Sequence, residues 1–429
     1  MRPSVVLPRL IPTLLAALLS PPAPEVASTT VAEVTELRQL YSQRNFFALR
    51  NRLDELAGDS SMASEIGFLR AATLQAFNRL TESTAIIGEL LARRDSPPEL
   101  GLELQALRLT NSLRQHRYRA ALESARLLLA SPVVDRRPIL AAETRNKLSL
   151  LETLSEFPPQ QVSIDGPTRM ALGNTRLVPL TINDSALRFA LDTGANFSVI
   201  ARSQAESLHL AIRPAGLVIA TSTAQHVVGD VTIADRVDIG NVHLRHVVFL
   251  VLPDDVLSFD GGKAIPGLVG FPVVEAMREV RFRRDNVIEI PQNPPRRSLG
   301  NLALDELEPL TLVRYRKDEL LCRLDTGAAQ TVFYEPFYRR YGEQIRATGH
   351  AITATAVGIG GAQQIPAYRL QRMALTIAAA GIDLRRVEVY TRAIRRPDEN
   401  YLYCNIGRDA LDLYRAYTIN FEDMALTLE

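Results

Sequence analysis

The sequence predicts an α+β fold, in which an N-terminal α-helical repeat domain is followed by two mainly β lobes related by pseudo-twofold symmetry. Three observations lead to this prediction. Apolar residues recur at helical spacing up to about residue 155, and short alternating or apolar runs typical of strands follow. The string Leu-Asp-Thr-Gly-Ala occurs twice, around Asp192 and Asp325, which lie 325 − 192 = 133 residues apart. Segments downstream of the two copies also match, which indicates one β-rich unit used twice.

Residues 1–28 have the features of a secretory signal peptide. Arg2 and Arg9 precede an apolar run at 10–19, and prolines and small residues follow it. The run is too short to span a bilayer comfortably. We therefore expect a cleaved signal and an extracytoplasmic protein, periplasmic or secreted, with no stable membrane span after signal removal. The alternative is a disordered N-terminus, or an uncleaved one that anchors the chain.

Residues 29–157 are predicted to form the helical domain. Thr30 and Glu33 make a capping box at its start. Ala followed by Leu or Ile recurs at Leu49, Ile86 and Leu122. The steps, 86 − 49 = 37 and 122 − 86 = 36 residues, resemble the period of tetratricopeptide-like helix pairs, which stack on their neighbours. Such a domain suits a groove for a protein partner or substrate, and equally a spacer or a pro-segment packed on the β lobes.

Two strand hairpins are predicted to lead to the repeated motif. Lobe 1 is assigned to residues 168–292 and lobe 2 to residues 301–429, with a Pro-rich linker that ends at Gly300. In each lobe, two apolar runs around a polar turn end at the motif: runs 177–182 and 187–191 before Asp192, and runs 310–313 and 320–324 before Asp325.

The Gly of each motif indicates how two carboxylates can meet. A carboxylate at the end of a buried strand, followed by Gly, sits on a turn whose backbone can approach another segment closely. Gly194 and Gly327 supply such turns. If the two loops face each other, Asp192 and Asp325 lie close enough to share a proton, because adjacent carboxylates cannot both ionise cheaply. The sequence therefore predicts a catalytic dyad.

The duplicated motif resembles that of aspartic peptidases, and specifically of the retropepsin-like family. Retropepsin-like enzymes have short lobes and an Ala after the Gly, as here, but they normally build one site from two identical chains. The residues that carry the resemblance are Asp192, Thr193, Gly194, Ala195 and Ser198 in lobe 1, and Asp325, Thr326, Gly327, Ala328 and Thr331 in lobe 2. It implies that the two threonines tie the loops together. It also implies that apolar strands ending at Gly270 and Gly407 thread beside the loops and hold them.

The resemblance implies an aspartic endopeptidase that hydrolyses peptide bonds in a cleft within one chain. Asp192 and Asp325 would activate a water molecule, and a peptide or protein substrate would bind as an extended strand. The candidate flap is glycine-rich and contains Gly358, Gly360 and Gly361. Its counterpart in lobe 1, about 220–229, has less glycine.

Two other arrangements stay open. One is a non-catalytic peptide-binding scaffold, made of a helical repeat and an inactive peptidase fold, although Asp and Gly are intact in both motifs. The other is pairing of lobes between chains. The distance between the two carboxylates within one chain would distinguish pairing of lobes between chains from a site within one chain.

Ala195 and Ala328 bear on the pH range of activity. They stand where pepsin-like relatives commonly have Ser or Thr, so each carboxylate lacks one hydroxyl donor. Fewer donors to the charged form depress a carboxyl pKa less. We therefore expect activity that extends toward neutral pH.

The remaining composition narrows the function classes. The formal net charge is +1, which leaves no footprint for nucleic acid. His243 and His246, three residues apart on a predicted strand, face opposite sides, so we expect no metal site, and no cofactor is implied. For Cys322 and Cys404, a disulfide in an oxidising compartment is one interpretation, and two buried free thiols are the favoured one.

Overall fold

The structure is a computed structural model in which helices occupy the first third of the chain and strands the rest. It describes residues 30–56, 63–93, 97–173, 176–220, 226–259, 263–394 and 400–429. The predicted signal segment and the tip of the predicted lobe 1 flap, 221–225, lie outside these residues. In the described part, no helix combines the length and the apolar character needed to cross a membrane.

The helical region comprises residues 31–154. Its helices are α1 (Val31–Ser42), α2 (Phe46–Glu55), α3 (Ala63–Ala76), α4 (Leu80–Leu91), α5 (Pro98–Arg114), α6 (Tyr118–Leu129), the short 3₁₀ helix η1 (Val134–Arg136) and α7 (Pro138–Leu154). The predicted capping box is confirmed, because the Thr30 hydroxyl accepts from the Glu33 N–H and the Glu33 carboxylate accepts from the Thr30 N–H.

The register of the helix pairs differs from the predicted one. The turns that enter α2, α4 and α6 each contain one residue with positive φ: Arg44, Asn78 and His116. The steps between these turns are 78 − 44 = 34 and 116 − 78 = 38 residues. Counted from the turns, the equivalent positions are Leu49, Ser83 and Ala121, and all three are fully buried. The prediction that Ile86 is equivalent to Leu49 is therefore wrong in register. Equivalent positions are those that pack at the same place between helices, and they need not carry the same residue type.

The first β-rich region comprises residues 161–290. Its elements are β1 (Gln161–Ile164), β2 (Thr168–Ala171), β3 (Val178–Ile182), β4 (Ser185–Leu191), β5 (Ser198–Ala201), α8 (Arg202–Ser207), β6 (Arg213–Ala220), β7 (His226–Ile239), β8 (Val242–Leu252), η2 (Asp254–Leu257), β9 (Ser258–Phe259), β10 (Lys263–Ala264), β11 (Gly267–Val269), α9 (Phe271–Ala276), β12 (Glu279–Arg283) and β13 (Val287–Ile290). The predicted first hairpin is confirmed as β3 and β4, whose turn residues Asn183 and Asp184 both have positive φ.

The second β-rich region comprises residues 302–428. Its elements are β14 (Leu302–Asp305), β15 (Glu308–Tyr315), β16 (Asp318–Leu324), β17 (Val332–Phe333), α10 (Glu335–Thr348), β18 (His350–Gly358), β19 (Gly361–Ile377), β20 (Ala380–Tyr390), β21 (Cys404–Ile406), α11 (Arg408–Leu411), β22 (Ala416–Asn420) and β23 (Ala425–Leu428). The predicted second hairpin is confirmed as β15 and β16.

The main sheets of the two β-rich regions share the order of their equivalent strands and differ in the end strands β1 and β14, which pair with β8 and β15. Among the described strands, the first sheet runs β1-β8-β5-β11-β4-β3-β7-β6, and β7 also pairs with β8. The second runs β14-β15-β16-β21-β17-β20-β19-β18, and β15 also pairs with β19. In both, a short strand runs parallel to the strand that ends at the motif Asp, as β11 does beside β4 and β21 beside β16. His246 and Arg386, at matched places in β8 and β20, both have positive φ.

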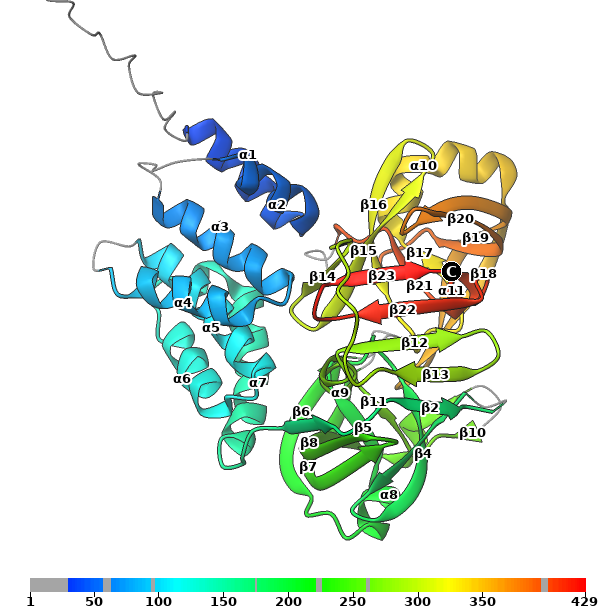
Figure 1. Ribbon diagram of the computed structural model, residues 1–429. Helices are drawn as coiled ribbons and strands as arrows, with labels where there is room; N and C mark the ends of the chain where they lie inside the picture. Colours follow the sequence, from blue (N-terminus) through cyan, green and yellow to red (C-terminus); the bar gives the residue numbers. More distant parts are fainter. Residues whose placement is uncertain are drawn as a thin grey trace, which may run out of the picture.

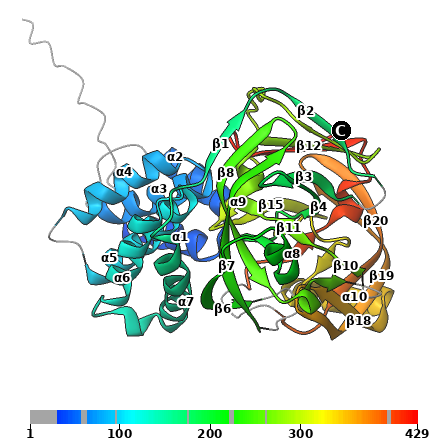
Figure 2. The same ribbon diagram turned by 90° about the horizontal axis from the view of Figure 1, so that it is seen from below.

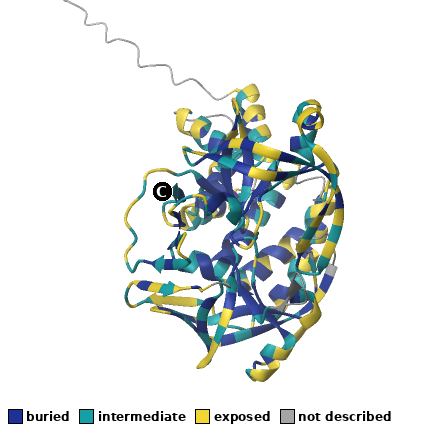
Figure 3. Cartoon of the chain, turned by 90° about the vertical axis from the view of Figure 1, so that its right-hand side faces the viewer, coloured by how far each residue is buried: buried dark blue, intermediate teal, exposed yellow. Residues whose placement is uncertain are grey.

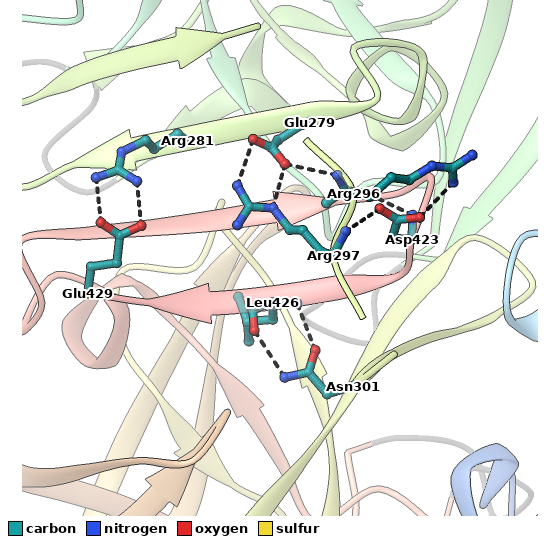
Figure 4. A network of polar contacts seen from close by, with 9 residues as sticks. Glu279, Arg281, Arg296, Arg297, Asn301, Asp423, Leu426 and Glu429 are labelled. Atoms are coloured by element: carbon teal, nitrogen blue, oxygen red, sulfur yellow. Dashed lines mark hydrogen bonds and ion pairs between the residues drawn. The ribbon is translucent and has the colours of Figure 1, made fainter. Parts of the chain in front are cut away.

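A smaller sheet joins the two β-rich regions. Its described strands run β2-β13-β12-β22-β23, and β12 pairs antiparallel with β22, with Val280 opposite Ile419 (Figure 1). The linker before the second region crosses this sheet, where the Arg297 guanidinium donates two hydrogen bonds to the Glu279 carboxylate, at 2.7 and 2.9 Å (Figure 4). The closing hairpins of the two halves are therefore one continuous structure.

Cys322 and Cys404 form a disulfide, so the interpretation as free thiols is wrong. The two residues face each other in the parallel pair β16 and β21, with Cα atoms 4.7 Å apart. This separation lies within the range that is usual for disulfides. The sequence spacing could not reveal this, because the register of two strands 82 residues apart is set by the sheet.

The helical region packs against both β-rich regions, and Figure 2 shows it beside the first. Arg114 on α5 pairs with Glu275 of the first region at 2.6 Å, and Lys147 on α7 pairs with Glu306 of the second at 2.7 Å. One apolar cluster includes residues from α1 to α5 and from both β-rich regions. In Figure 3 buried residues gather in the interior and exposed residues lie mainly along the outer edges. The helices are thus an integral part of the molecule.

Candidate active site

The two motif loops are anchored by matching main-chain hydrogen bonds. Asp192 follows β4, and its N–H donates to the Val269 carbonyl of β11 at 3.0 Å. Asp325 follows β16, and its N–H donates to the Ile406 carbonyl of β21, also at 3.0 Å. Each Asp is therefore held at the point where a buried parallel strand pair ends.

Gly270 and Gly407 let the chain pass close to each loop. The Gly270 N–H donates to the Ser198 hydroxyl and the Gly407 N–H donates to the Thr331 hydroxyl, each at 3.0 Å. A Cβ atom on Gly270 would lie 2.3 Å from the Phe197 carbonyl carbon, and one on Gly407 would lie 2.6 Å from backbone atoms of Gln330. Only Gly fits either place, because real Cβ atoms do not approach backbone this closely.

Thr193 and Thr326 connect the loops by crossed hydrogen bonds. The Thr193 N–H donates to the Thr326 hydroxyl at 3.1 Å, and the Thr326 N–H donates to the Thr193 hydroxyl at 3.0 Å. Each hydroxyl then donates across the junction, from Thr193 to the Leu324 carbonyl and from Thr326 to the Leu191 carbonyl. Both threonines are buried. The two loops are therefore locked together within one chain.

This junction brings the two carboxylates together. A Cβ atom on Gly194 would lie 2.7 Å from the Asp325 carboxylate oxygens, and one on Gly327 would lie 2.4 Å from Asp192 Oδ1. Each motif glycine thus faces the carboxylate of the other β-rich region. Both aspartates remain partly exposed.

The environment of Asp192 favours its protonated form. Burial and the neighbouring Asp325 raise the pKa of Asp192 to about 7, although the Gly194 N–H and the charge of Arg323 act in the opposite direction. Two carboxylates this close share one proton and titrate as a pair. The pair can therefore offer a carboxylate and a carboxylic acid side by side near neutral pH.

The other motif residues support the loops through the main chain. The Ala195 carbonyl accepts from the Phe271 N–H at 2.8 Å, and the Ala328 carbonyl accepts from the Arg408 N–H at 2.9 Å. The Ala328 N–H also donates to Asp325 Oδ1 at 2.9 Å. Ala328 thus supplies a donor to the carboxylate through its backbone.

The glycines of the candidate flap form the turn between β18 and β19. Gly358 faces Gly361 across the hairpin, and Gly360 and Gly361 both have positive φ. The Gly360 N–H donates to the Val256 carbonyl of the first β-rich region at 3.2 Å. The tip of this hairpin therefore reaches from the second β-rich region to the first.

Sequence reasoning missed two residues of the site, Asn405 and Arg323. The Asn405 side-chain amide donates to Asp325 Oδ2 at 3.0 Å. The Arg323 guanidinium donates to the Gly194 carbonyl of the opposite loop. A signal was present in both cases, since each is a polar residue inside an otherwise apolar run beside the motif, 320–324 for Arg323 and 404–406 for Asn405.

Comparison with known protein families gives a match in the part of the chain that contains the first motif loop. The family model described as aspartyl protease matches residues 178–273, which carry Asp192 and Gly270. No curated protein matches the chain. Among solved structures, the chain is similar to a retropepsin-like aspartic protease from Rickettsia conorii, at 17% identity and a TM-score of 0.21, over 30% of this chain and 92% of that one. The segment that carries the first motif loop is therefore similar in sequence to aspartyl proteases.

Proposed function

We propose that this protein is an aspartic endopeptidase whose catalytic dyad is Asp192 and Asp325. The observation that carries the proposal is the contact of each motif glycine with the carboxylate of the opposite β-rich region, within a single chain. The match of residues 178–273 to aspartyl proteases supports it.

The proposed reaction is a proton transfer around one water molecule. The charged member of the dyad accepts a proton from the water as the water oxygen bonds to the carbon of the peptide carbonyl. The protonated member donates its proton to the carbonyl oxygen. The tetrahedral intermediate then collapses as the C–N bond breaks: the leaving nitrogen receives the proton that the first Asp took from water, and the other Asp takes a proton from a hydroxyl of the intermediate. No metal or cofactor takes part in this scheme.

The pH range of the reaction follows from the dyad. With the pKa of Asp192 at about 7, the shared proton is retained up to that pH and is lost above it. We therefore propose that activity extends to neutral pH and declines on the alkaline side.

The architecture proposed for this function has two retropepsin-like lobes, 168–292 and 301–429, related by a pseudo-twofold axis. The shared strand order of the two main sheets and the crossed threonine bonds support it. The substrate would lie as an extended strand under the hairpin of β18 and β19, with Gly358, Gly360 and Gly361 as the flap tip.

We propose that the helices of 29–157 form tetratricopeptide-like pairs, in agreement with the turns that enter α2, α4 and α6. Their packing on both β-rich regions supports a role in holding the peptidase part, beside the proposed role as a groove for a protein partner. α7 covers β6, which pairs with β7 at the edge of the first main sheet: the Asn146 amide donates to the Val218 carbonyl at 2.8 Å, and the Ser149 hydroxyl donates to the Ala215 carbonyl at 2.6 Å.

We propose an extracytoplasmic location, periplasmic or secreted, after removal of residues 1–28. The disulfide between Cys322 and Cys404 supports it, because such bonds persist in oxidising compartments.

The test is incubation of the protein with a diverse peptide library across a pH range, with and without a statine-type inhibitor. We expect inhibitor-sensitive cleavage, and a loss of roughly 10²–10⁴-fold or more in kcat/KM for Asp192→Asn or Asp325→Asn. Asp184→Asn is the matched control, because Asp184 lies in an exposed turn with positive φ that Asn tolerates. Peptide binding without cleavage by the folded wild type would instead support the scaffold alternative.

A further inference from the structure

One pair of equivalent buried side chains beside the two motif loops differs in polarity. β11 places Leu268 beside the first loop, and β21 places Asn405 at the equivalent position beside the second, each two residues before the glycine that follows its strand. Leu268 is 2% exposed and Asn405 is 7% exposed. Asn405 Nδ2 donates to Asp325 Oδ2 at 3.0 Å, whereas Leu268 offers no polar atom to Asp192.

The two carboxylates consequently receive different numbers of donors. Asp325 accepts from the Gly327 N–H and the Ala328 N–H at 2.9 Å each, and from the Asn405 amide. Within the described residues, the hydrogen bond from protein N–H groups to the Asp192 carboxylate is that of Gly194, at 2.8 Å. In the first loop the N–H of Ala195 turns to the Asp192 main-chain carbonyl, at 3.4 Å. N–H donors stabilise a carboxylate in its charged form, so Asp325 is the better site for the negative charge.

Arg323 is the cation that could reverse this preference. Its guanidinium binds the Gly194 carbonyl and lies 3.7 Å from the Glu308 carboxylate, so its charge is shared with an acid. Its charge lowers the pKa of Asp192, but burial and Asp325 act more strongly and leave that pKa at about 7. The direct donors at Asp325 therefore decide the distribution.

We propose that Asn405 fixes the position of the proton shared by the dyad, with Asp325 as the carboxylate and general base and Asp192 as the carboxylic acid. This assignment rests on the proposed peptidase function. The Asp325 carboxylate takes a proton from water as the water oxygen bonds to the peptide carbonyl carbon. Asp192 gives its proton to the carbonyl oxygen, whose π bond breaks. Asn405 exchanges no proton, and is a positioning residue that acts through Asp325.

The first test compares the pH dependence of kcat/KM in the wild type and in Asn405→Leu, which copies the residue of the first loop. Loss of a hydrogen bond to a charged group should move the acidic limb of the profile upward by roughly one pH unit, about a tenfold loss of rate below that limb. Leu268→Asn is the reciprocal variant, and it should leave the acidic limb in place or move it downward. A uniform loss of rate by Asn405→Leu at every pH, with an unmoved profile, would show a merely structural role.

The second test does not depend on catalysis. An epoxide such as glycidyl phenyl ether esterifies ionised carboxylates, so brief labelling at acidic pH followed by peptide mapping reports which Asp carries the charge. We expect label on Asp325 in excess of Asp192 in the wild type, and a ratio reduced by roughly tenfold in Asn405→Leu. Preferential labelling of Asp192 in the wild type would overturn the assignment. Labelling as expected in a protein that cleaves no peptide would leave the assignment standing and reject the peptidase function.

Discussion

The two β-rich regions present the same main-chain framework around two different sets of side chains. Both end a parallel strand pair at an Asp, both pass a Gly behind the loop, and both bind that Gly N–H with a buried hydroxyl, from Ser198 or Thr331. At the two glycines, a Cβ atom would clash with the backbone of the adjacent loop. What is duplicated is therefore the geometry that brings two carboxylates together.

The positions beside that framework have diverged. In the first region the ring of Phe189 fills the space over Gly267, where a Cβ atom would lie 2.5 Å from the ring. The equivalent residues of the second region are Cys322 and Cys404, joined by the disulfide. Leu268 is likewise replaced by Asn405. The comparison teaches that framework positions fix where the carboxylates lie, whereas neighbouring positions set their charge and the local stability.

The largest effect is expected where the two regions are joined. Glu279 is 5% exposed, and its carboxylate accepts from Arg297 and from the Asn420 amide. Glu279→Ala leaves the buried Asn420 amide and the partly buried Arg297 guanidinium without their acceptor, so urea unfolding should show a loss of roughly 3–5 kcal/mol. Glu289→Ala is the control on the neighbouring strand β13, where more exposed ion pairs should cost less than about 1 kcal/mol. Equal losses would mean that the joining network contributes no more than the surface pairs.

The disulfide distinguishes the second region from the first. Replacing Cys322→Ala together with Cys404→Ala removes a cross-link over 82 residues and should lower the free energy of unfolding by about 4 kcal/mol. The double variant Cys322→Phe with Cys404→Gly copies Phe189 and Gly267 of the first region. It should recover part of the lost stability if the Phe ring fills the space over the Gly as it does in the first region. Unfolding in urea of both variants and the wild type measures this. A double Ala variant as stable as the wild type would contradict the prediction.

The dyad should destabilise the protein as pH rises. The pKa of Asp192 is raised from 3.8 to about 7 in the folded state, mainly by burial. Below the lower value both states bind the proton, and between the two values the unfolded state ionises while the folded state does not, so stability falls until about pH 7. Asp192→Asn should therefore stabilise the protein by up to about 4 kcal/mol at pH 8 and by little at pH 3.

The comparison is with Asp325→Asn, measured by thermal unfolding at the same two pH values. Asp325 already has three N–H donors, so its replacement should bring a smaller gain, which comes from removing the charge that helps to raise the pKa of Asp192. Equal stabilisation by the two variants would remove the difference between the loops.

The smallest effects should be equal in the two regions. Thr193→Val and Thr326→Val each remove one hydroxyl that accepts from a main-chain N–H and donates to a carbonyl of the other region. Each should cost roughly 1–3 kcal/mol, because buried groups are left unpaired. Thr355→Val, on the exposed side of β18, is the control, expected within about 0.5 kcal/mol of the wild type. If the two variants lost different amounts of stability, the two halves of the junction would contribute unequally although their hydrogen bonds match.

Local patterns in the sequence predicted the parts of the site that depend on local geometry. The hairpin before Asp192 follows from an apolar alternation around Asn183 and Asp184, residues that adopt positive φ readily. The places of Gly194 and Gly270 follow from the need for close backbone approach. In the helical region, by contrast, the Ala-apolar pairs predicted steps of 37 and 36 residues, whereas the turns lie 34 and 38 residues apart, because contacts between helices choose which residues are equivalent.

The sequence by itself determined that two Asp-bearing loops of one design lie in one chain, since a short motif and its flanking strands are encoded in consecutive residues. Only the tertiary structure decided that Cys322 meets Cys404, that Asn405 reaches Asp325 and that β12 pairs with β22. Each of these depends on the register between strands far apart in sequence. A shift of one residue would turn every side chain to the other face of the sheet, and no local pattern records which register the packed core selects.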